Sequence, residues 1–179
     1  MRLVRCSSAL GACLPSLKLA SLVFALCVLS ACARSSFDGQ VYRDSEVAFR
    51  VGQLPPSFHA VKAEGTRLAF RDDANDITVA VNGRCGLDGD DVPLPALTRH
   101  LFIHFTQREV ISERRVELDG REALRTELSA ELDGVPRRFV VYVLKKDGCV
   151  YDFMWIARPE ATASVTEFER FVLGFSTRI

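Results

Sequence analysis

The residues whose types and spacing best fit chemistry are His100 and His104, four positions apart. On one helix this spacing places both imidazoles on the same face, as in zinc proteases, and Asp90 or Asp91 is a conceivable third ligand. Such a protease also needs a Glu directly after the first His as general base, and Leu101 stands there. Two histidines at the edge of an apolar helix stripe are the simpler interpretation. A metal-dependent or other hydrolase using His100 and His104 is therefore the alternative function.

Other patterns give no support for an enzyme. The chain has no Gly-x-Ser-x-Gly turn for a nucleophilic serine and no glycine-rich loop for phosphate. The acidic segments 72–76 and 88–91 lack the spacing of an EF-hand calcium loop and are typical of solvated turns. We therefore predict no catalytic residue, no resident metal and no cofactor.

A different chemistry is indicated near the N-terminus by Cys32. It follows Leu29-Ser30-Ala31, and before it an apolar run from Leu19 to Ala31 follows three basic residues. The run has 13 residues, against about 20 for a membrane-spanning helix. This pattern resembles a bacterial lipoprotein signal peptide over residues 1–31, which would leave Cys32 carrying diacylglyceryl and fatty acyl (palmitate) chains.

Removing residues 1–31 leaves a polar tether over 32–40 and one domain over 41–179. The mature chain then has 20 Lys and Arg against 23 Asp and Glu, which argues against a nucleic-acid partner. The lipid on Cys32 would supply the contact with the membrane. Ala33 and Arg34 lack the Asp that retains enteric lipoproteins in the inner membrane, so we expect periplasmic exposure from the outer membrane.

Cleavage also leaves Cys85 and Cys149 as a pair in an oxidising compartment. A disulfide between them is possible, with a structural role, and two separate buried thiols are the other interpretation. Sequence alone does not decide between these.

Short alternating segments separated by turn residues predict strands from Val41 onward. Those segments are 47–51, 58–63, 67–71 and 77–81. Pro93-Leu94-Pro95 then predicts the start of a helix, which continues through Leu97 and Leu101.

Three Asp-Gly pairs, at 119–120, 133–134 and 147–148, predict a meander of hairpins with two-residue turns. This register places Leu132 opposite Val135, Leu128 opposite Phe139, Leu124 opposite Val143 and Val141 opposite Met154. In the first hairpin it sets Arg114 and Arg115 opposite Arg125 and Leu124, so we expect a longer loop or a bulge there.

The last two strands are apolar on both sides and need two covers. The helix beginning near Pro95 can supply one. The other candidate is the C-terminal segment, where Ser164 and Glu167 form a capping box before Phe168, Phe171 and Val172. The predicted fold is α+β: a mostly antiparallel sheet with a C-terminal meander, covered by helices as an α/β/α sandwich.

The order of these elements resembles the Mog1/PsbP-like fold over about residues 41–176. The residues that carry the likeness are Leu54-Pro55, Asp119-Gly120-Arg121, Asp147-Gly148-Cys149 and Gly174-Phe175-Ser176. Phe58 stands where a tryptophan is common in that family. The resemblance implies a scaffold for protein contacts and brings no catalytic residues.

These observations predict a lipid-anchored protein of the bacterial cell envelope that acts as a non-catalytic binding or assembly module. Its partner is an envelope protein that the sequence does not identify. A carrier of a small ligand, with a cavity between sheet and helix, is a third class of function.

Overall fold

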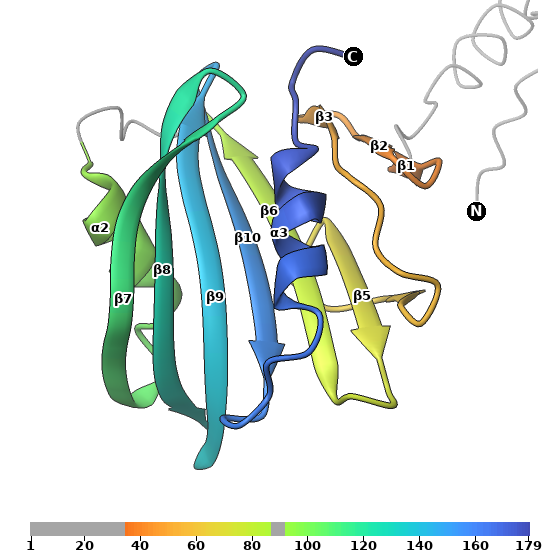
Figure 1. Cartoon of the computed structure of the whole chain (residues 1–179). Coiled ribbons are helices and arrows are strands. Elements are labelled where there is room, and N and C mark those ends of the chain that lie inside the picture. The colour runs from red at the N-terminus through yellow and green to blue at the C-terminus, as the bar shows by residue number, and fades with distance from the viewer. Residues whose placement is uncertain (1–34, 87–91) are drawn as a thin grey trace, which may run out of the picture. The chain divides into compact units, whose positions relative to one another are not determined.

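An antiparallel sheet of seven strands dominates the computed structural model of the chain, which describes residues 35–86 and 92–179 (Figure 1). Its strand order is β4-β5-β6-β10-β9-β8-β7. The strands are β4 (His59–Val61), β5 (Leu68–Asp72), β6 (Ile77–Cys85), β7 (Thr106–Leu118), β8 (Arg121–Leu132), β9 (Val135–Lys146) and β10 (Cys149–Ala157). A smaller sheet contains β1 (Ser36–Phe37), β2 (Val41–Arg43) and β3 (Ala48–Arg50). The helices are α2 (Leu94–Leu101) and α3 (Val165–Leu173).

The Asp-Gly turns connect β7 to β10 as the sequence predicts. At all three turns both residues have positive φ, from 49° to 77°, the conformation that a tight two-residue hairpin requires. The predicted register is confirmed in the two later hairpins, where Leu128 lies opposite Phe139 and Met154 opposite Val141.

The expectation for the first hairpin was wrong. Arg114 does pair with Arg125, with no longer loop and no shift near the turn. The bulges lie farther along, between Thr106 and Glu109 and between Val110 and Ser112. The physical reason is that β7 is an edge strand exposed over most of its length, so its arginines reach water from either side.

One face of the sheet, which we call the α3 face, carries most of the core. α3 and the small sheet pack on it through buried aromatic residues. Phe153 and Trp155 of β10 are completely buried there, as is Phe168 of α3. Gly52 and Gly174 let the end of α3 approach the chain after β3, because a Cβ on Gly174 would lie 2.4 Å from the Gly52 nitrogen.

The opposite face, the α2 face, has a smaller core. α2 packs mainly on β8 and β9, and the Phe102, Phe105 and Phe139 rings pack edge to face. Beyond α2, the side chains of Met154 and Ile156 remain partly exposed.

Three features predicted from the sequence need correction. The sheet is not covered by helices on both sides, because α2 and α3 have only eight and nine residues and span a few strands each. Ser164 precedes α3 in the left-handed conformation and makes no capping hydrogen bond. The predicted tether, 32–40, contains β1, whose Phe37 ring packs against Phe70 at 5.8 Å.

Within the described ranges 35–86 and 92–179, no helix is both long and apolar enough to cross a membrane. The predicted signal peptide, residues 1–31, and Cys32 lie outside the described residues.

Candidate ligand-binding groove

A groove runs along the α2 face between α2 and β7, and β8 forms its floor. The floor residues alternate along β8 and are Glu122, Leu124, Thr126 and Leu128. The β7 wall presents Val110, Glu113 and Arg115, and the α2 wall presents Leu94, Pro95, Thr98 and Phe102. We call this the α2–β7 groove. It consists of two hollows that share Pro95, of about 200 Å³ at the Phe102 end and about 500 Å³ at the Arg115 end.

The smaller hollow is apolar but contains one unusual polar group. Phe102, Val110 and Leu128 line it, and so does Thr98 of α2. Thr98 is 4% exposed, and its Oγ1 is buried without a hydrogen-bond partner among the described residues. Such a hydroxyl costs folding free energy unless a ligand supplies the missing partner.

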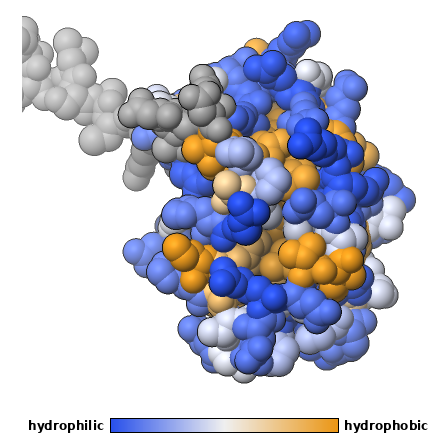
Figure 2. Space-filling view, turned by 90° about the vertical axis from the view of Figure 1, so that its left-hand side faces the viewer, coloured by the Kyte–Doolittle hydropathy of each residue, from blue (hydrophilic) through white to orange (hydrophobic). Residues whose placement is uncertain are grey.

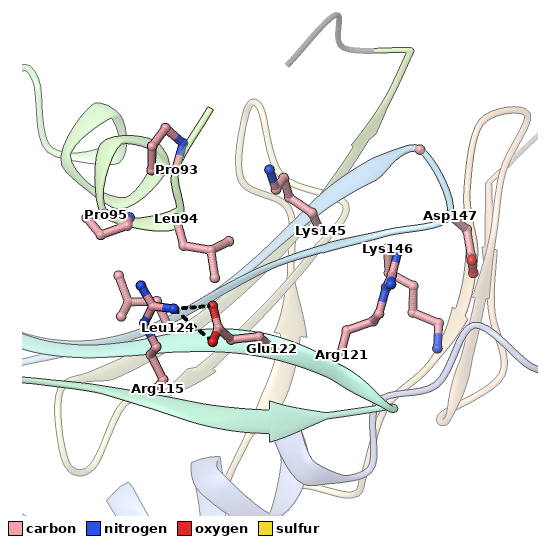
Figure 3. A pocket seen from close by; sticks show the side chains of 11 residues that line it. Pro93, Leu94, Pro95, Arg115, Arg121, Glu122, Leu124, Lys145, Lys146 and Asp147 are labelled. Atoms are coloured by element: carbon pink, nitrogen blue, oxygen red, sulfur yellow. Dashed lines mark hydrogen bonds and ion pairs between the residues drawn. The ribbon is translucent and has the colours of Figure 1, made fainter. Parts of the chain in front are cut away.

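The larger hollow is rich in cations (Figure 3). Arg115 donates to both carboxylate oxygens of Glu122 at 2.9 Å, and Lys145 donates to the Val92 carbonyl at 3.1 Å. Arg121 is exposed and has no side-chain partner in the described part of the chain. This end of the groove can therefore accept an anionic group.

Three exposed apolar residues lie in or next in sequence to the lining of the smaller hollow. Val110 lines it, Ile111 follows Val110 on β7, and Ile103 follows Phe102 just after α2; all three are 54–60% exposed. Figure 2 views this side of the molecule and shows apolar patches set in a hydrophilic surface. Clustered exposed apolar residues beside a groove are typical of a protein contact site.

The structure does not bring together the two histidines of the alternative zinc site. α2 ends at Leu101, so His104 lies beyond the helix and the four-residue spacing no longer places it on one helical face with His100. Both side chains are exposed. The third histidine, His59, is on β4 at the other end of the sheet, and in residues 35–86 and 92–179 no three His, Cys, Asp or Glu side chains form a metal-binding group.

The structure joins Cys85 and Cys149 by a disulfide. The two cysteines lie opposite each other on the paired strands β6 and β10, with their Cα atoms 4.0 Å apart. The bond packs against the core of the α3 face, where it has a structural role.

Half-buried Glu127 and buried Asp152, on opposite faces of the sheet, have pKa values shifted in opposite directions. Hydrogen bonds from Arg138 lower the pKa of Glu127 on the α3 face, where Arg125 also pairs with Glu127 and with Glu169 of α3. On the α2 face, burial raises the pKa of Asp152, against the opposing charge of Arg84. Arg84 Nη2 lies 3.3 Å from Asp152 Oδ2, yet that oxygen accepts no hydrogen bond from the described residues.

Sequence reasoning missed the α2–β7 groove. Thr98 looks like an ordinary polar residue of an amphipathic helix, and the open wall made by β7 has no sequence period that marks it. A usable signal was present in Val110-Ile111, an apolar pair within a strand otherwise full of charge.

Comparison with known proteins defines the class of fold. No protein-family model and no curated protein matches the sequence. Among solved structures, the chain is similar to cyanobacterial PsbP (CyanoP) from Synechocystis sp. PCC 6803, with a TM-score of 0.56 and 16% identity. The match covers 84% of this chain and 99% of CyanoP. The chain therefore has a PsbP-like α+β fold.

Two further solved structures share the fold. LpqN, described as involved in cell envelope biogenesis of Mycobacterium tuberculosis, matches with a TM-score of 0.54 and 12% identity over 80% of this chain and 88% of LpqN. A Bacteroides thetaiotaomicron protein matches with a TM-score of 0.52 and 9% identity. The match covers 73% of this chain and 45% of the Bacteroides chain.

Proposed function

We propose that the chain is a lipid-anchored accessory protein of the bacterial envelope, in which Cys32 carries the lipid and the α2–β7 groove binds an envelope protein. The observation that carries this proposal is the apolar hollow with the unpartnered Thr98 hydroxyl. A hollow of this kind is stabilised when a ligand fills it and completes the hydrogen bond. The exposed apolar residues around it supply additional contact area for a partner.

The sequence and the fold support the setting. The lipoprotein-like pattern before Cys32 favours export and anchoring, with the outer membrane as the expected site. LpqN, which has a similar fold, is itself described as involved in cell envelope biogenesis. The acidic mature chain fits a protein partner better than a nucleic acid.

Site-specific photo-crosslinking in a bacterial envelope tests the groove. The full chain would carry a photoreactive amino acid in place of Ile103, which is 58% exposed and directly follows the lining residue Phe102. The matched control carries it in place of Leu173, which is 64% exposed on α3. We expect discrete adducts with an envelope protein from position 103 only. No adduct at 103, or the same adducts from both positions, would contradict the proposal.

Mass analysis of the native N-terminus tests the anchor separately. We expect a mature chain that begins at an acylated Cys32 and sediments with membranes, and a C32A variant that keeps its leader and loses acyl labelling. A free thiol at position 32 in the wild-type product would overturn lipid anchoring but leave the groove unaffected.

A further inference from the structure

We infer that the α2–β7 groove recognises an extended acidic segment of a partner protein. One apolar side chain of the segment would occupy the hollow between Phe102 and Leu128, and its carboxylates would lie near Arg115, Arg121 and Lys145. This inference rests on the proposed function and adds the chemistry of the partner. It follows from the shape of the groove, its charge and its unpartnered hydroxyl.

The groove has the shape of a linear ligand. Its floor follows β8 from Leu128 to Glu122, seven residues joined by six steps of about 3.3 Å each, or roughly 20 Å. A partner segment of about six residues in the same extended conformation spans that length. It can reach both the apolar end and the cationic end at once.

The charge of the groove differs in sign from that of the mature chain. Six cationic and three anionic residues line the two hollows, and one of the cations, Lys146, is paired with Asp119 outside the groove. The remaining five cations outnumber the three anions, whereas the mature chain has 20 basic residues against 23 acidic ones. Arg99 at the apolar end and Arg121 at the other end are exposed and have no side-chain partner in the part of the chain that the structure describes. Positive charge gathered on an acidic protein steers acidic partners to this site.

The Thr98 hydroxyl adds a point of recognition. Thr98 lines the apolar hollow at 4% exposure, and its Oγ1 has almost no exposed surface and no partner among the described residues. A polar group of the ligand reaches this oxygen only when the wall of the hollow shifts, and it can then make the hydrogen bond that the folded chain leaves unmade.

The groove, and not the free edge of β7, is the site that fits this partner. β7 carries six charged residues from Arg108 to Glu117, and two bulges interrupt its pairing with β8. Charges and bulges on an edge strand discourage addition of another strand.

Selection from a random heptapeptide display library on the intact purified chain tests the inference. We expect enriched peptides to combine one large apolar residue with two or more acidic residues toward one end. Their affinity should fall about tenfold or more in R99E/R121E and should weaken with added salt. The matched control is R50E, a reversal at an exposed arginine of β3 that has no side-chain partner in the described chain.

Replacing Thr98 by Val separates recognition from folding. T98V removes the unpartnered hydroxyl at nearly constant shape, so we expect unchanged or higher thermal stability together with weaker binding of the selected peptides. Weaker binding in a destabilised T98V would be only a folding effect, so T98S, which keeps the hydroxyl, must restore binding.

Three results would overturn the inference. The wild-type chain could select the same peptides as the R99E/R121E variant, or it could select peptides without acidic residues. Photo-crosslinks from position 103 could also join two copies of this chain. Adducts with an envelope protein at position 103 combined with failed peptide selection would leave the proposed function standing and reject only the acidic segment. Absence of both would reject the two together.

Discussion

The two faces of the seven-stranded sheet differ in how completely they are packed. The α3 face has a continuous aromatic core, and the pairs Arg125–Glu169 and Arg138–Glu127 link α3, β8 and β9. The α2 face has a smaller core and an open groove, and it holds two of the three buried polar atoms without hydrogen-bond partners among the described residues, on Thr98 and Asp152. The third, Trp155 Nε1, lies in the core of the α3 face. The larger core on the α3 face concentrates stability there, which leaves the α2 face free to keep an open groove for binding.

The largest expected effect is on the packed face. F153A removes a completely buried ring of β10 and should lower the free energy of unfolding by about 3–5 kcal/mol. V110A, in the wall of the groove at 60% exposure, should change it by less than about 0.5 kcal/mol. Urea unfolding of both variants measures this, and similar losses in the two would remove the distinction between the faces.

The disulfide should contribute the next largest amount. Cys85 and Cys149 are 64 residues apart in sequence, and releasing the bond with C85S/C149S should cost about 2–4 kcal/mol through the freer unfolded chain. Peptide binding in the groove should persist under conditions where this variant stays folded. Loss of binding at full folding would show that the bond shapes the groove.

The buried carboxylates should respond in opposite directions to substitution. E127Q removes an ion pair with Arg138 on the α3 face and should lower stability at neutral pH by about 1–3 kcal/mol. D152N removes a buried charge on the α2 face, so stability should stay unchanged or rise by up to about 1 kcal/mol. A large loss in D152N would mean that the Arg84 pair holds this face together.

Their pH dependence has opposite signs as well. Folding lowers the pKa of Glu127. Its carboxylate therefore adds to the free energy of unfolding above the pKa of the unfolded state, and this stabilisation is lost as the pH falls toward the folded-state pKa. Folding raises the pKa of Asp152, so the folded state binds a proton at a higher pH than the unfolded state does. The free energy of unfolding therefore increases as the pH falls through the folded-state pKa of Asp152. Unfolding measured against pH should show a flatter acid loss in E127Q and a steeper one in D152N.

The smallest expected effect is at the histidines. H100A/H104A changes two exposed side chains that the end of α2 separates, so stability should move by less than about 0.5 kcal/mol. Metal analysis and hydrolase assays of the variant should match those of wild type. Zinc bound to wild type and lost in the variant would revive the hydrolase alternative.

Much of the sheet follows from local chemistry in the sequence. Asp133-Gly134 and Asp147-Gly148 fix tight turns, and the alternation around Phe139 and Val141 then fixes the register. The same counting also gave the observed pairing of Arg114 with Arg125, and only the expected longer loop or bulge near that turn was wrong. Counting residues does not show that β7 is an exposed edge strand, where facing arginines are tolerated.

The groove depends on features that no local pattern encodes. It exists because the short α2 covers β8 and β9 but leaves the inner side of β7 open, which depends on the three-dimensional path of the chain. The missing partner of Thr98 is likewise a property of the packing around it. The disulfide could be predicted only in part. The sequence shows the two cysteines, but only the register of β6 and β10 shows that they lie opposite each other.

Amide hydrogen exchange of the intact chain, with and without a selected acidic peptide, tests the division between the two faces most directly. The account predicts that the peptide slows exchange in α2, β7 and β8 and leaves α3 unchanged. Slower exchange confined to α3 and the small sheet, or no change anywhere at saturating peptide, would contradict it.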